Sequence, residues 1–156
     1  IRQCDKCNTY TETPLCTICQ DPKRQQDTLC IIETPMDIAA IEQTHTYHGI
    51  YFVLNGCLSP LDGVGPAEIQ LPKLFALLDK TPQIKELIIA TNPTMEGKAT
   101  AHYIANHLKN KPIQCTRIAF GVPIGGEIEY LDGHTLAHAL SSRKIFSQPI
   151  NVQPNQ

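Results

Sequence analysis

The sequence lacks a dominant charge sign, a long apolar run and any internal repeat. It has 156 residues, with 13 Lys or Arg against 15 Asp or Glu and a net charge of −2. Overall charge therefore does not indicate a nucleic-acid binder, and any DNA contact would need a local basic patch. No apolar run is long enough to cross a bilayer, so we expect no membrane partner. The length suits one ordinary domain with a real core and a small appendage.

The amino-terminal residues do not resemble a secretory signal peptide, which argues against disulfides because these need an oxidising compartment. Four cysteines nevertheless stand there in two C-x-x-C pairs: Cys4, Cys7, Cys16 and Cys19. Each spacing lets both thiolates of a pair reach one ion, and the short segment between the pairs brings all four sulfurs together. This ligand set is typical of a closed, tetrahedral, structural Zn²⁺ site. A thioredoxin-like redox motif would instead be single and would follow a strand.

The other cysteines, Cys30, Cys57 and Cys115, have no partner at ligand spacing. Cys30 and Cys115 lie in apolar, strand-like runs, where a free cysteine behaves as a small hydrophobe. We interpret Cys30 and Cys115 as core residues.

Beyond a polar linker at 21–27, apolar runs alternate with helical patterns. We expect strands at 28–33, 50–54, 86–91 and 115–119, and helices at 36–43, 68–78, 96–108 and 136–140. Continuous apolar strands separated by helices favour an α/β fold with a mainly parallel sheet flanked by helices. The expected divisions are a Cys4 zinc module at 1–26, the α/β domain at 27–124, a carboxyl-terminal strand and helix region at 125–146, and a flexible tail at 147–156.

Polar residues cluster where the expected strands end, which is the edge at which parallel sheets bind their ligands. Glu33 closes the first strand, and a carboxylate there needs a partner because its burial is costly. Asn92 and Thr94 follow the third strand, and these neutral groups hold Mg²⁺ poorly. Glu96 is the one carboxylate close to them in sequence. We therefore expect Mg²⁺ binding to be weak or absent.

Two glycine motifs resemble nucleotide sites but have the wrong spacing. A phosphate loop built on Gly97 and Lys98 would need a glycine in place of Asn92 and a Ser or Thr in place of Ala99. The segment 63–68 lacks the third glycine of a dinucleotide fingerprint. We expect no nucleotide binding by either route.

Taken together, these motifs resemble the bacterial recombination mediator family RecR. The four cysteines match the zinc ligands of that family, and the loop 56–66 (GCLSPLDGVGP) and the stretch 119–132 (AFGVPIGGEIEYLD) match its signatures. The second stretch has been likened in the family to a Walker B strand without a Walker A. The resemblance implies a Toprim-like domain, in which Glu33 stands at the place of the Toprim glutamate and 92–97 at the place of an Asp-x-Asp pair.

The resemblance implies a non-enzymatic mediator of DNA repair and recombination. Such proteins form clamp-like homo-oligomers on gapped or double-stranded DNA, and they work with RecO and RecF in the bacterial cytoplasm, at the nucleoid. The family begins with a helix-hairpin-helix segment that does not precede the cysteines here. We therefore expect a fragment that forms a dimer rather than the ring tetramer of the family, with 125–146 as the interface between copies.

We also name candidate residues for contact with a partner and with DNA. The acidic partner site comprises Glu33, Asn92, Thr94 and Glu96. The DNA-binding candidates are Lys23, Arg24 and Lys98. The alternative function is an active, Mg²⁺-dependent Toprim nuclease or topoisomerase, which would need the Asp-x-Asp pair that this sequence does not have.

Overall fold

The computed structural model describes residues 1–146, so the flexible tail predicted at 147–156 lies outside the described residues. The chain divides into two compact units, Ile1–Ile118 and Ala119–Gln156. Each unit is described by itself. The finer boundaries expected at residues 26 and 124 stay predictions.

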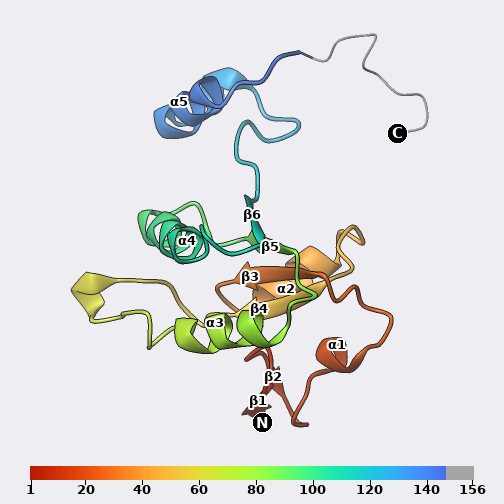
Figure 1. Ribbon diagram of the computed structural model, residues 1–156. Coiled ribbons are helices and arrows are strands. Elements are labelled where there is room, and N and C mark those ends of the chain that lie inside the picture. The colour runs from red at the N-terminus through yellow and green to blue at the C-terminus, as the bar shows by residue number, and fades with distance from the viewer. Residues whose placement is uncertain (147–156) are drawn as a thin grey trace. The chain divides into compact units, whose positions relative to one another are not determined.

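The first unit contains a four-stranded sheet in the order β4-β3-β5-β6, in which every neighbouring pair is parallel. Its strands are β3 (Thr28–Ile32), β4 (Ile50–Val53), β5 (Glu86–Ile89) and β6 (Gln114–Arg117). Three helices follow these strands in turn: α2 (Met36–Glu42), α3 (Leu71–Lys80) and α4 (Met95–His107). The predicted α/β fold is therefore confirmed (Figure 1).

The two faces of the sheet bury different side chains because successive strand residues point to opposite sides. Leu29 and Ile31 belong to the larger core, which also contains apolar residues of α3 and α4. Cys30 and Ile32 belong to a second core, covered by α2 and by Ile18 of the short helix α1 (Thr17–Gln20). Burial on both faces explains why β3 and β4 are nearly continuous apolar runs in the sequence.

Two helices differ from their predicted bounds by more than one residue at an end. Helix α3 begins at Leu71 rather than at residue 68, because Gln70 adopts a left-handed conformation with φ of 60° that cannot continue a right-handed helix. Helix α5 spans Gly133–Ser141 and is longer than the predicted 136–140. Its earlier start is stabilised by the Asp132 carboxylate, which accepts a hydrogen bond from the Thr135 amide at 3.0 Å.

The amino-terminal module packs along the outer edge of β4. The module contains the small antiparallel pair β1 (Arg2–Gln3) and β2 (Tyr10–Thr11) together with α1. The Val53 amide donates to the Cys7 carbonyl at 2.8 Å, and the buried Asn8 side chain donates to the Val53 carbonyl at 3.0 Å. Lys73 of α3 donates to the same Asn8 side chain. The module thus satisfies backbone groups of an edge strand that could otherwise pair with another chain.

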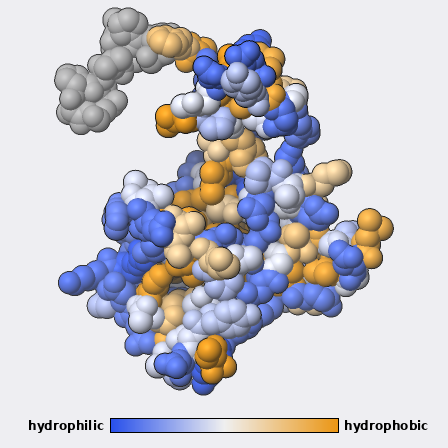
Figure 2. All heavy atoms as spheres, turned by 180° about the vertical axis from the view of Figure 1, so that it is seen from behind, coloured by the Kyte–Doolittle hydropathy of each residue, from blue (hydrophilic) through white to orange (hydrophobic). Residues whose placement is uncertain are grey.

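Residues 119–146 of the second unit form a loop, the 3₁₀ turn η2 (Ile128–Tyr130) and α5. Large apolar side chains are exposed in it, including Ile124, Ile128 and Tyr130. Figure 2 shows hydrophobic residues at the molecular surface beside hydrophilic ones. Within residues 1–146, no helix has the length and apolarity needed to span a membrane.

Candidate metal centre and sheet-edge site

The four predicted zinc ligands meet in space. The Sγ atoms of Cys4, Cys7, Cys16 and Cys19 all lie within 4.8 Å of one another. The first three of these residues are buried and Cys19 is half-buried. Within residues 1–146 this is the one cluster of three or more potential metal ligands.

The cysteine cluster has the chemistry of a structural zinc site. Backbone amides of Cys16 and Cys19 donate to the Cys4 and Cys16 sulfurs at 3.3 and 3.4 Å, which orients the ligands. Hydrogen bonds from the Cys19 and Cys7 thiols lower the pKa of Cys16, and the hydrogen bond with Cys16 raises the pKa of Cys7. When thiols bind a doubly charged ion as thiolates, the ion replaces these shared protons. The four sulfurs therefore fit one tetrahedral Zn²⁺ with no open coordination position.

The second candidate site lies at the carboxyl edge of the sheet and begins with Glu33, directly after β3. The Glu33 residue is only 8% exposed, and its Oε2 accepts a hydrogen bond from the Asn92 amide at 2.8 Å. Because Asn92 follows the neighbouring strand β5, the contact confirms that the two predicted residues come together. The Glu33 carboxylate therefore holds the loop after β5 and is already hydrogen-bonded within the chain.

Thr94 and Gly97 shape the loop that leads from β5 into α4. The Thr94 hydroxyl accepts from the Gly97 amide at 3.0 Å and so caps the helix. The Thr91 hydroxyl donates to the Gly97 carbonyl at 2.7 Å. A Cβ on Gly97 would collide with the Asn92 carbonyl oxygen and would lie 3.1 Å from Oε2 of Glu33. The loop is thus tightly wound around a position that only glycine fits.

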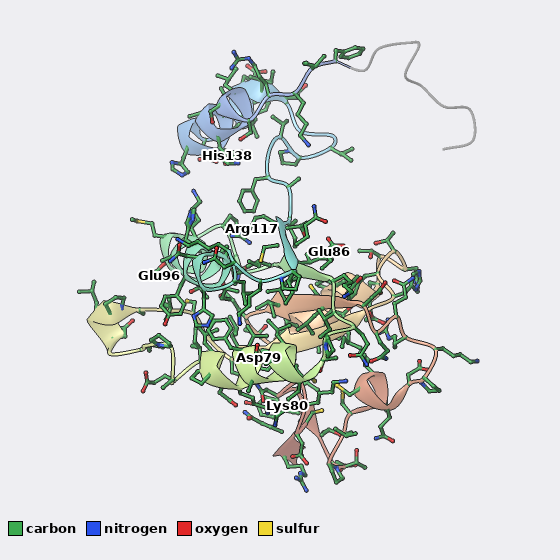
Figure 3. All side chains as sticks on the ribbon, viewed as in Figure 1. Asp79, Lys80, Glu86, Glu96, Arg117 and His138 are labelled. Carbon is green, nitrogen blue, oxygen red and sulfur yellow. The ribbon has the colours of Figure 1, made fainter. Side chains whose placement is uncertain are left out.

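Glu96, in contrast, is an exposed residue in the first turn of α4 (Figure 3). Burial together with the nearby Glu33 and Glu96 carboxylates raises the pKa of the Cys57 thiol, which places both carboxylates near one cysteine. Cys57 and Cys115 are only half-buried, whereas Cys30 is buried as predicted. The interpretation as core residues therefore holds fully for Cys30, whereas Cys115 is partly buried against the larger core.

Arg117 is a residue of this site that the sequence analysis missed. It ends β6, and its Nη1 donates to the carbonyls of Ile89 and Thr91 at 2.9 and 2.6 Å. Its Nη2 lies 3.4 Å from the carbonyl oxygen of Asn92. Burial lowers the pKa of Arg117, and the Glu33 carboxylate opposes that shift. The available signal was a basic residue near the carboxyl end of an expected parallel strand.

The DNA-binding candidates occupy two separate parts of the first unit. Lys23 is exposed, whereas the Arg24 side chain is only 11% exposed and pairs with Glu42 at 2.5 Å. The Arg24 guanidinium also lies 6.0 Å from the centre of the Tyr51 ring. Lys98 lies in the first turn of α4, beside the sheet-edge site. Lys23 is therefore the residue whose substitution would disturb the fold least, and all three stay predictions.

Three family models match consecutive parts of the chain. A model described as RecR, Cys4-zinc finger domain matches residues 1–21. A model described as Toprim domain matches residues 27–119. A model described as RecR, C-terminal matches residues 121–144.

Two curated relatives carry the name Recombination protein RecR. The protein from Coxiella burnetii is 62% identical over 143 residues, which cover 92% of this chain and 71% of the relative. The protein from Hahella chejuensis is 50% identical over 147 residues, which cover 94% of this chain and 73% of the relative.

Proposed function

The chain belongs to the RecR family of recombination proteins, and on that premise we propose that it is a non-enzymatic mediator of DNA recombination and repair. In this role it binds gapped or double-stranded DNA as part of a clamp-like homo-oligomer. It works there with RecO- and RecF-type proteins, in the bacterial cytoplasm at the nucleoid. The zinc module keeps the amino-terminal part of the clamp rigid.

One observation carries the non-enzymatic proposal: the Thr94 and Glu33 side chains at the sheet edge already accept hydrogen bonds within the chain. A Toprim metal site needs carboxylates free to coordinate Mg²⁺. Here the Thr94 hydroxyl caps α4 and the Glu33 carboxylate accepts the Asn92 amide. Asn92 and Thr94 add no negative charge, and Glu96 alone would hold a hard cation weakly. These contacts favour a docking site over a catalytic one.

The proposed occupant of the sheet-edge site is a basic surface of a RecO-type protein. Acidic groups repel the phosphates of DNA, whereas a positive protein surface complements them. Glu96 is the exposed carboxylate that a partner can reach, and Glu33 supports the loop behind it. DNA contact falls instead to basic residues elsewhere, with Lys23 first among them.

Residues 125–146 are the proposed contact between copies. Their exposed Ile128, Tyr130 and Leu140 side chains are apolar surface of the kind that oligomer interfaces cover. The proposed assembly is a homo-oligomer whose copies meet through this apolar surface.

The function is tested by mixing the protein with supercoiled and gapped plasmid, with and without Mg²⁺, at low and moderate salt. We expect the DNA to stay intact and to shift only at low salt, because binding through few phosphate contacts is weak and salt weakens it further. Glu33→Gln keeps a carbonyl oxygen for the Asn92 amide and serves as the matched variant. Mg²⁺-dependent cleavage or relaxation that disappears in Glu33→Gln would establish the alternative, an active Toprim nuclease or topoisomerase.

Partner docking is tested separately with Glu96→Lys and a purified RecO-type protein. We expect affinity to fall at least about five-fold, because reversing a rim charge in a complementary interface costs on the order of 1 kcal/mol or more. Isothermal titration calorimetry at two salt concentrations measures the loss of affinity and its dependence on ionic strength. Glu12→Lys, an exposed carboxylate of the zinc module, is the charge-matched control. Equal affinity of wild type and Glu96→Lys would remove Glu96 from the interface. Glu33→Ala is less informative, because it also removes the acceptor of the Asn92 amide.

A further inference from the structure

The loop between β5 and α4 is held by two oppositely charged side chains from the strands on either side. Strand β5 lies between β3 and β6 in the sheet. Glu33 follows β3 and accepts the amide hydrogen of Asn92, while Arg117 of β6 donates toward the carbonyl oxygen of the same residue. The amide and the carbonyl of one residue are thus bound by an acid and a base that come from different strands.

Arg117 contacts more than this one peptide group. Its guanidinium also donates to the carbonyls of Ile89 and Thr91, at 2.9 and 2.6 Å. The Ile89 carbonyl is at the end of β5 and the Thr91 carbonyl is two residues beyond it. There the ladder with the neighbouring strands stops, and backbone oxygens need other donors. A guanidinium carries five N–H donors in a fixed planar fork, so one side chain can satisfy several carbonyls at once.

The groups around Arg117 are oxygen donors of the type that hard divalent cations prefer. They comprise the three backbone carbonyls and, within electrostatic range, the Glu33 carboxylate. Mg²⁺ and Ca²⁺ bind carboxylate and carbonyl oxygens, often in combination with water. At this edge of the sheet, however, the positive charge among these oxygens belongs to the Arg117 guanidinium of the chain itself.

We propose that Arg117 is the resident cation of the sheet-edge site, a positioning residue whose guanidinium holds the β5–α4 loop in shape without a divalent ion. By holding residues 91 and 92, it also sets where α4 begins and hence where Glu96 is presented (Figure 3). The proposal rests on the proposed function only where it gives the loop a role in partner docking. The stabilisation of the loop by Arg117 can be measured without a partner or DNA.

Hydrogen exchange of the full chain tests the proposal, with Arg117→Met, Arg117→Lys and wild type compared with and without millimolar Mg²⁺. Arg143→Met, at an exposed arginine of the second unit, is the matched control. In Arg117→Met we expect the Asn92 and Gly97 amides to exchange roughly ten-fold faster or more, the size expected from losing hydrogen bonds to a charged donor. Mg²⁺ should restore part of that protection in Arg117→Met and change nothing in wild type. Arg117→Lys keeps the charge without the fork, and its exchange rates should lie between the two.

The proposal would be overturned if the Asn92 and Gly97 amides of Arg117→Met exchanged as slowly as those of wild type. It would also be overturned if Mg²⁺ slowed this exchange equally in wild type and in Arg117→Met. If Arg117→Met does not fold, Arg117→Lys decides, and unchanged loop exchange in that variant would also overturn it. Failure here leaves the plasmid and partner experiments untouched. Equally, a chain that cleaves DNA or ignores its RecO-type partner could still have its loop held by Arg117.

Discussion

Cys16→Ser is expected to release zinc and to unfold the amino-terminal module. Cys16 is the most connected ligand, since its sulfur lies 3.6 Å from that of Cys7 and accepts the Cys19 amide. A module this small has little apolar core of its own, and structural zinc supplies an apparent binding energy of about 10–16 kcal/mol in comparable peptides. Zinc content per chain and limited proteolysis of residues 1–21 measure the effect. A strong chelator should produce the same proteolysis pattern in wild type.

The loss of zinc should also affect β4, because the module satisfies the outer edge of that strand through Cys7 and Asn8. We therefore expect Cys16→Ser to aggregate more readily than wild type, as exposed edge strands do. Cys57→Ser is the matched control, since Cys57 lies outside the cluster and should leave zinc content unchanged. A Cys16→Ser protein that keeps full zinc and stays resistant to protease would contradict the assignment of the metal centre.

The second large effect is expected from Gly97→Ala, which should destabilise the first unit although alanine favours helices. Gly97 lies in the first turn of α4, where helix propensity alone would contribute about 1 kcal/mol of stability. The added Cβ, however, would overlap the Asn92 carbonyl oxygen, and it would crowd the Glu33 carboxylate at 3.1 Å. Overpacking against fixed backbone costs on the order of 3 kcal/mol, so the clash outweighs the propensity gain.

Urea unfolding measures this balance, and we expect a lower midpoint with an unchanged slope. Ala99→Gly, two residues later at an exposed position of the same helix, isolates the propensity contribution and should cost about 1 kcal/mol. A Gly97→Ala protein as stable as wild type would mean that the loop has room to move. The inference that Asn92 and Glu33 pack closely against α4 would then be wrong.

Most of the sheet was predictable because its signals are local. A parallel strand covered on both faces is apolar at every position, and Leu29 to Ile32 shows this directly. The bounds of two helices, α3 and α5, differ from the prediction by more than one residue. The left-handed conformation of Gln70 has no clear sequence signal, whereas the cap at Asp132 follows a known preference that the analysis did not use.

The candidate sites divide in the same way. The zinc ligands were predicted in full, because two short spacings are enough to bring four sulfurs to one ion. Glu33 and Asn92 were predicted to meet because strand ends of a parallel sheet share an edge. Arg117 was not predicted, because its position near a strand end is a weak signal and its partners are backbone carbonyls, which every residue has. The pairing of Arg24 with Glu42 was missed because nothing local links residues that lie 18 positions apart.

The sequence by itself determined the zinc ligands, the parallel α/β class and the family, because each depends on residue types at short or ordered spacings. Only the tertiary structure decided how these parts are used. It placed the zinc module on the edge of β4 through Asn8 and Val53, 45 residues apart. It also assigned the Glu33 carboxylate and the Arg117 guanidinium to opposite sides of one loop. Such contacts depend on where backbone amides and carbonyls lie in space, and that position is set by the packing of the whole unit.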